Sequence, residues 1–148
     1  MNAFLAVSFP QADILQPFAA MMLLTIVVWI YMYARRLSYM FSHGIDAQQV
    51  HSPETMAALI PETVARPANN LKNLFEMPVL FYAVCLAIYQ MSAVDALYVQ
   101  LAWAFVAART LHSLVHCTFN HVMTRFTFYL LSCLALFAMI GRMILSPG

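Results

Sequence analysis

The feature that most constrains this chain is a series of long apolar stretches. The first runs from Ile14 to Tyr33 and is interrupted only by Gln16 and Thr25. A helix needs about 20 apolar residues to cross a bilayer. Because 64% of the 148 residues are hydrophobic and only 9% are charged, the chain has too few polar side chains to cover a surface that faces water. The sequence therefore predicts an all-α integral membrane protein.

The apolar stretches predict four membrane-spanning helices in one domain over residues 1–148. We place the spans at about residues 14–34, 67–91, 96–117 and 121–145, with a polar loop at about residues 35–65. Three of these spans are joined in order by very short connections, which favour antiparallel neighbours. We expect an up-down-up-down four-helix transmembrane bundle.

Local signals refine these boundaries. In the loop, Ser52-Pro53-Glu54 predicts the first turn of a short interfacial helix. The second span is expected to open with Pro67 at its first helical position and to bend at Pro78. Asp95 is expected to cap the third span.

The distribution of basic residues predicts the orientation. Near the long loop and the last connection lie Arg35, Arg36, Arg66, Lys72, Arg109 and Arg125. Only Arg142 lies near the opposite ends of the spans. By the positive-inside rule, the loop is cytoplasmic and both termini lie outside the cytoplasm.

Charge and cysteine content exclude some classes of function. The net charge is +1 and no run of basic residues occurs, so we expect no nucleic-acid partner. Cys85, Cys117 and Cys133 stand singly in apolar stretches, which indicates no disulfide framework and no activated cysteine.

Polar residues recur at helical spacing in three of the predicted spans. These stripes are Arg66, Asn69, Asn73 and Glu76; Arg109, His112 and His116; and Arg125, Tyr129 and Ser132. Because neighbouring spans run in opposite directions, the stripes should meet in the cytoplasmic half of the membrane. Charged groups there cost about 2.5–3.5 kcal/mol each on insertion scales, so they call for an explanation.

The charges in these stripes favour an anion as ligand. Arg66, Lys72, Arg109 and Arg125 oppose the single acid Glu76, a formal +3. The alternative is that the residues pair with each other and only fix the helix register.

A metal site is the other chemistry that this spacing permits. His112 and His116 are four residues apart and share a helix face. No glutamate lies between them, and Arg109 one turn away would repel a cation. We predict no metal site.

Three motifs resemble the MAPEG family, the membrane-associated proteins in eicosanoid and glutathione metabolism. The strongest is the segment from Arg66 to Glu76, RPANNLKNLFE, which is similar to the family signature at the start of the second span. The others are Arg109-x-x-His112-x-x-x-His116 and Arg125-x-x-x-Tyr129. The motifs occur in order, and the resemblance covers most of the chain.

The resemblance implies a homotrimer that binds glutathione as co-substrate at subunit interfaces. The residues implied as contacts are Arg35, Lys72, Asn73, Glu76, Arg109, His112, His116, Arg125 and Tyr129. Arg125 is the predicted catalytic residue, because a guanidinium favours the thiolate form of a thiol. The second substrate would be an apolar electrophile or a lipid hydroperoxide that arrives through the bilayer.

Departures from the family pattern leave other functions open. His116 stands where many members have tyrosine, Lys72 where many have arginine, and apolar Phe126 follows Arg125. The sequence looks closest to a bacterial branch, which implies the bacterial inner membrane. We predict a glutathione transferase or peroxidase; the alternatives are a non-catalytic binding or assembly protein on the same scaffold and, ranked last, a small transporter.

Overall fold

The computed structural model describes residues 10–145, and these residues form helices without a strand. The elements are η1 (Gln11–Ile14), α1 (Leu15–Ser42), η2 (Ala47–Val50), α2 (Pro53–Leu59), α3 (Glu62–Leu74), α4 (Met77–Gln90), α5 (Ala96–Cys117) and α6 (Val122–Leu145). The terminal residues 1–9 and 146–148, for which we predict a position outside the cytoplasm, lie outside this description.

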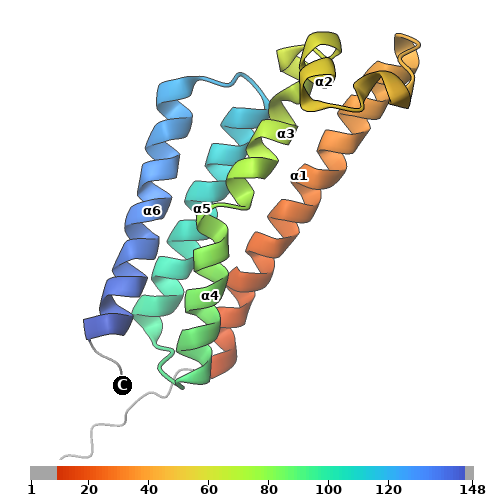
Figure 1. Cartoon of the computed structure of the whole chain (residues 1–148). Coiled ribbons are helices and arrows are strands. Elements are labelled where there is room, and N and C mark those ends of the chain that lie inside the picture. The colour runs from red at the N-terminus through yellow and green to blue at the C-terminus, as the bar shows by residue number, and fades with distance from the viewer. Residues whose placement is uncertain (1–9, 146–148) are drawn as a thin grey trace, which may run out of the picture.

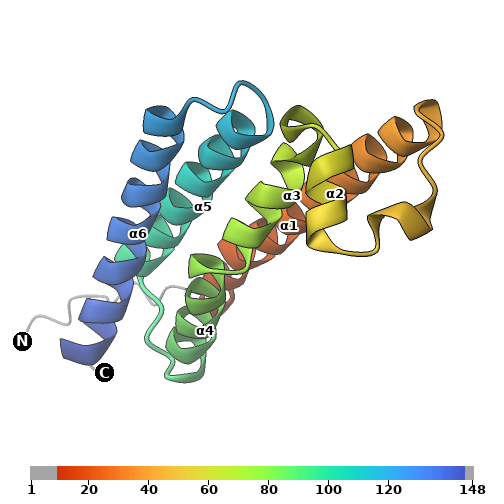
Figure 2. The same ribbon diagram turned by 45° about the horizontal axis from the view of Figure 1, so that its top comes forward.

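The long helices alternate in direction along one axis (Figure 1). α3 and α4 follow one another in line and run opposite to α1, then α5 and α6 alternate again. α5 packs most extensively against α6, and α1 packs most extensively against α3. Contacts of α5 with α1 and α3 join the two pairs, and the short α2 lies beside α1 and α3 at one end (Figure 2).

The interior is apolar at one end of the molecule and polar at the other. Phe81 on α4 and Phe105 on α5 are fully buried and stacked, with ring centroids 4.4 Å apart. Toward the α2 end the buried side chains include Asn70, Arg109, His112, Ser113 and His116. Large apolar side chains cover the outside instead, for example Leu23 and Ile26 on α1 and Leu134 and Phe137 on α6. This inverted distribution suits a protein surrounded by lipid.

Among the described residues, three helical segments are long and apolar enough to cross a membrane. They are Gln11–Ser42, Glu62–Gln90 and Val122–Leu145, of which the second joins α3 and α4. α5 has 22 residues but is not among them. Its polar residues, Arg109, His112 and His116 above all, lower its mean hydropathy, and they are buried against the other helices.

The first long helix extends further than the span predicted to end near residue 34. Arg35 and Arg36 end the apolar stretch, but α1 continues to Ser42. Gly44 follows the C-terminal cap of the helix, His43, and its φ of 61° is accessible to glycine without strain. There the Gly44 N–H donates to Phe41 O (3.4 Å) and the Ile45 N–H donates to Met40 O (3.0 Å), a Schellman motif.

The predicted loop contains helical structure. The short helix expected after Ser52 is confirmed as α2, with Ser52 as N-cap and Pro53 in its first turn. The prediction that Asp95 caps the helix after it is also confirmed, since its side chain accepts a hydrogen bond from the Tyr98 N–H.

The prediction that Pro67 opens the second long helix is wrong. α3 begins at Glu62, and Pro67 lies inside it. Proline has no N–H, so the carbonyl of Thr63 loses its usual helical donor. Arg35 replaces that donor, because its Nη2 donates to Thr63 O at 3.2 Å.

The bend expected at Pro78 is instead a break two residues earlier. α3 ends at Leu74, α4 begins at Met77 with Pro78 in its first turn, and Glu76 has non-helical dihedral angles of −97° and −102°. A proline disfavours the helical conformation in the residue before it and cannot donate to the carbonyl four residues back. The break therefore lies on the N-terminal side of Pro78 and includes Glu76.

Candidate functional site

A cavity of about 280 Å³ lies where the α3–α4 break meets α5 and α6. Five of the nine predicted site residues line it, together with apolar Val122 and Phe126. The five predicted residues are Asn73, Glu76, His112, Arg125 and Tyr129. The cavity is slightly smaller than the roughly 300–1,000 Å³ of typical ligand sites.

Arg125 is held in place on α6 by its neighbours. Its Nη1 donates to Asn120 Oδ1 at 2.6 Å and to His116 Nε2 at 3.0 Å. His112 Nδ1 donates to the backbone carbonyl of Arg125 at 2.8 Å. His116 is thus placed behind Arg125, in contact with a residue that lines the cavity.

Arg109 is fully buried and does not line the cavity. Its guanidinium lies over the ring of Tyr129, with Cζ 4.6 Å from the ring centroid, and over Phe105 at 5.5 Å. Within residues 10–145, none of its three guanidinium nitrogens has a hydrogen-bond partner. A buried cation without a partner is costly, so this part of the interior is suited to an anionic group.

Arg35 and Lys72 lie apart from this cavity in the same chain. Lys72 lines a cavity between α1, α2 and α3, and Arg35 lines a hollow along α1 that Val64 of α3 also borders. Arg35 donates to Tyr31 Oη at 2.9 Å as well as to Thr63 O. Lys72 is separated from Glu76 because the helix ends at Leu74, so the four-residue spacing does not place both on one face.

The sequence did not identify two residues that support the site, Asn120 and Glu62. Asn120 accepts from Arg125 and also donates to Glu62 Oε1 at 3.0 Å, which links the α5–α6 turn to the start of α3. Glu62 pairs with Arg66 at 3.0 Å, so Arg66 is neutralised locally. Asn120 has a left-handed backbone, with φ of 53°, which asparagine tolerates in turns. The signal available in the sequence was an asparagine in the short connection between two predicted spans.

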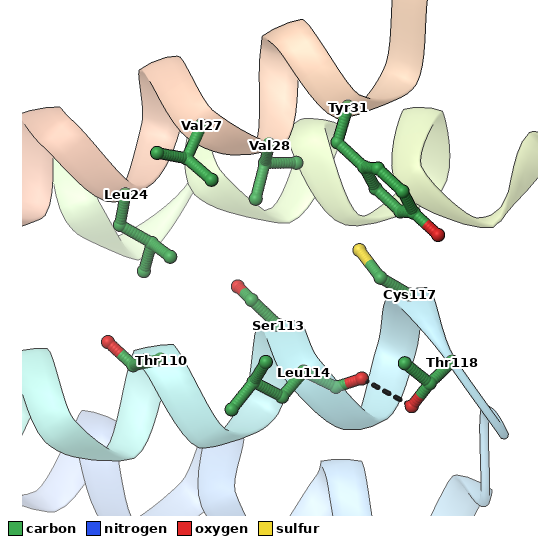
Figure 3. A pocket seen from close by; sticks show the side chains of 9 residues that line it. All are labelled: Leu24, Val27, Val28, Tyr31, Thr110, Ser113, Leu114, Cys117 and Thr118. Atoms are coloured by element: carbon green, nitrogen blue, oxygen red, sulfur yellow. Dashed lines mark hydrogen bonds between the residues drawn. The ribbon is translucent and has the colours of Figure 1, made fainter. Parts of the chain in front are cut away.

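A separate apolar cavity of about 250 Å³ lies between α1 and α5 (Figure 3). Val28 and Tyr31 line it from α1, and Ser113, Leu114 and Cys117 line it from α5. Ser113 and Cys117 are also tied to Asn70 of α3, because Ser113 Oγ donates to Asn70 Oδ1 (3.4 Å) and Asn70 Nδ2 donates to Cys117 Sγ (3.5 Å). These residues occupy a different face of α5 from Arg109, His112 and His116.

The described part of the chain has no group of three His, Cys, Asp or Glu side chains placed to hold a metal ion. His112 and His116 meet edge to face, with ring centroids 5.4 Å apart. One nitrogen of each is already used, by the Arg125 carbonyl and by the Arg125 guanidinium respectively. The pair therefore serves to position Arg125.

The comparison with protein families identifies the family of this chain. The model of the MAPEG family matches residues 14–145, nearly the whole chain. The chain belongs to the MAPEG family. Searches of curated proteins and of solved structures gave no match. Membership is consistent with a glutathione-related function in a membrane.

Proposed function

We propose that this MAPEG protein binds glutathione in the cavity between the α3–α4 break, α5 and α6, and uses it on apolar electrophiles or lipid hydroperoxides. The observation that carries the proposal is that Glu76 and Arg125 line one cavity with Asn73, His112 and Tyr129. Glutathione carries two carboxylates and one ammonium. Glu76 matches the ammonium, and the neutral groups match the peptide amides. The carboxylates require further cations, which this proposal takes from Arg109 and from Arg35 and Lys72 of a neighbouring subunit.

Each residue has a distinct role in this proposal. Glu76 accepts the ammonium group, and Asn73, His112 and Tyr129 supply hydrogen bonds that orient the peptide. Arg125 stabilises the thiolate, with its guanidinium positioned by Asn120 and His116. Arg109 adds positive potential from behind Tyr129. Bound glutathione supplies the sulfur nucleophile, and the chain's own residues bind and orient it.

The proposal also includes the assembly and its place in the cell. We propose four spans, with α5 as the fourth crossing, in a homotrimer in a bacterial inner membrane, with α2 on the cytoplasmic side. Most polar residues of α5, from Arg109 to His116, are buried, and its exposed face carries large apolar side chains such as Leu111 and Leu114, which supports a crossing that is shielded by protein. Arg35 and Lys72 line other cavities in their own chain, so in this proposal they reach glutathione from a neighbouring subunit.

A second candidate is a non-catalytic binding or assembly protein. The contact of His116 Nε2 with Arg125 Nη1 favours it, because it uses a guanidinium N–H that would otherwise be available to a ligand. This candidate predicts binding or oligomerisation without thiol chemistry.

The test is thermal unfolding of the detergent-purified protein with glutathione and with S-methylglutathione, which keeps the charges but cannot ionise at sulfur. A ligand at about 100 times its dissociation constant should add roughly 2.7 kcal/mol of stability. Stabilisation by both compounds supports the site. No shift with either at millimolar concentration would refute it.

Turnover separates the two candidates. Arg125→Ala should abolish conjugation across a panel of apolar electrophiles, while Arg125→Lys, which keeps the charge, should retain part of it. Stabilisation by glutathione without turnover in the unmodified protein would favour the non-catalytic candidate. Turnover that is unchanged in Arg125→Ala would exclude the proposed role of Arg125.

A further inference from the structure

A cavity of about 390 Å³ lies between α1, α2 and α3 (Figure 2 shows the three helices) and shares no lining residue with the cavity of Glu76 and Arg125. It is formed because α3 presents small side chains, Ala65 and Ala68, toward α2. Asn69 and Lys72 continue the same helical stripe and line the cavity as well. Arg36 lines it from α1.

The charges of this cavity are all of one sign. Arg36 and Lys72 are cationic, and no described aspartate or glutamate lines the cavity. Within residues 10–145, neither side chain forms a salt bridge or donates a hydrogen bond. The other basic residues nearby are satisfied, since Arg35 donates to Thr63 O and Arg66 pairs with Glu62. Two unpaired cations around one hollow favour an anionic ligand.

Polar groups around the cations narrow the class of anion. The Asn69 amide is within the lining, and His51 and Ser52 approach from the segment before α2. An arginine fork, a lysine point charge and neutral donors form a set that suits the several oxygens of a phosphate group. Val50, Met56 and Ile60 make the rest of the wall apolar.

The location links the cavity to the membrane boundary. Arg36 stands directly after the apolar part of α1, and the cavity is covered by α2, the short helix beyond it. Basic pockets at this depth are where lipid headgroups lie. An amphipathic wall fits a phosphate that is attached to a glycerol.

We propose that Arg36, Lys72 and Asn69 form a binding site for a phosphate group, supplied by the headgroup of an anionic glycerophospholipid or by free phosphate. The site goes beyond the proposed function, with which it shares Lys72. The test therefore uses variants of Arg36, which has no part in the proposed glutathione site. A bound phosphate stabilises the packing of α2 against α1 and α3.

The experiment uses the intact protein in detergent and measures the thermal midpoint. One arm compares inorganic phosphate with chloride at equal ionic strength. The other compares phosphatidylglycerol with diacylglycerol and with an ionised fatty acid, which lacks phosphate. We expect an upward shift of several degrees with the phosphate-bearing compounds. A response to phosphatidylglycerol identifies the headgroup as the source, and a response to inorganic phosphate alone identifies the free ion.

Variants assign the response to the cavity. Arg36→Gln should weaken the apparent dissociation constant at least about tenfold, and Arg36→Lys should recover part of it. Arg142→Gln removes one positive charge at the other end of the molecule and should leave the response unchanged. If Arg36→Gln does not fold, Ala57→Phe fills the cavity while keeping every charge and should also abolish the response.

Two results would overturn the proposal. One is a midpoint that responds to phosphate and phosphatidylglycerol no more than to chloride, diacylglycerol and fatty acid. The other is an Arg36→Gln protein that responds as the unmodified protein does. The stabilisation by glutathione is measured in parallel on Arg36→Gln and should be retained, so failure of this site is distinguishable from failure of the glutathione site.

Discussion

Asp95 joins two separate stabilising interactions at the end of the molecule opposite α2. Its Oδ1 accepts from the Tyr98 N–H at 3.0 Å, which caps α5, and from Arg142 Nη1 at 2.7 Å. Its Oδ2 accepts from Arg142 Nη2. The Arg142 guanidinium also lies 4.3 Å from the centroid of the Tyr98 ring. Substitutions at Asp95 can therefore separate the cap from the ion pair.

The magnitudes follow from geometry and exposure. An N-cap contributes about 1 kcal/mol. The side chains of Arg142 and Asp95 are 33% and 40% exposed, so the pair contributes about 0.2–1 kcal/mol. Asp95→Asn keeps the cap and should cost about 0.5 kcal/mol, whereas Asp95→Ala should cost about 1.5 kcal/mol. Arg142→Gln also loses the contact with Tyr98 and should cost about 1–1.5 kcal/mol.

The assay is denaturant unfolding of each variant in one detergent, with the double variant Asp95→Asn/Arg142→Gln to close the cycle. Equal stability of Asp95→Asn and Asp95→Ala would show that the cap contributes nothing. Additive single effects in the double variant would show that the two side chains are not coupled. Either result would refute the reasoning above.

The same pair predicts a dependence on pH. The hydrogen bonds from Arg142 hold the pKa of the Asp95 carboxyl below its usual range. The carboxylate is thus favoured in the folded state, and its contribution is fully present above the pKa in the unfolded chain, about 3.9. Stability should fall as the pH drops below that value toward the lower folded pKa. Arg142→Gln should reduce this part of the acid sensitivity, which a pH series of unfolding midpoints would measure.

Two further predictions concern the polar end. Arg35→Ala should lower the free energy of unfolding by about 1 kcal/mol, because Thr63 O loses its donor. The loss should be smaller in a Pro67→Ala background, where the backbone N–H at position 67 can donate to Thr63 O instead. Equal losses in both backgrounds, measured by denaturant unfolding, would contradict this. Asn120→Gly keeps the left-handed backbone and should lower the free energy of unfolding by about 1–2 kcal/mol, because the hydrogen bonds to Arg125 and Glu62 are lost. Asn120→Asp should restore the hydrogen bond to Arg125. Unchanged unfolding of Asn120→Gly would argue against this link.

The sequence was sufficient for what depends on composition and local signals. Long apolar stretches located α1, α4 and α6, and the residues Ser52 and Asp95 marked helix starts through well-defined capping chemistry. The 3.6-residue period also predicted that His112 lies near Arg125 and Tyr129.

What the sequence could not supply depends on contacts between distant residues. Pro67 inside α3 leaves the Thr63 carbonyl without a helical donor, and Arg35, 28 residues from Thr63 in the chain, satisfies it. The place of the α3–α4 break decides that Glu76 shares a cavity with Arg125 and that Lys72 faces α2. A helical stripe that assumes an unbroken helix cannot make this distinction.

The two faces of α5 have a practical consequence. Cys85 and Cys133 are buried, with 0% and 5% exposure, whereas Cys117 is partly exposed and lines the apolar cavity toward α1. A thiol-reactive fluorophore of small size should therefore label Cys117 first, without any engineered cysteine. It would report on movement between α1 and α5 while the opposite face of α5, with His112 and His116, stays unlabelled. The native chain thus provides its own position for a spectroscopic probe between α1 and α5.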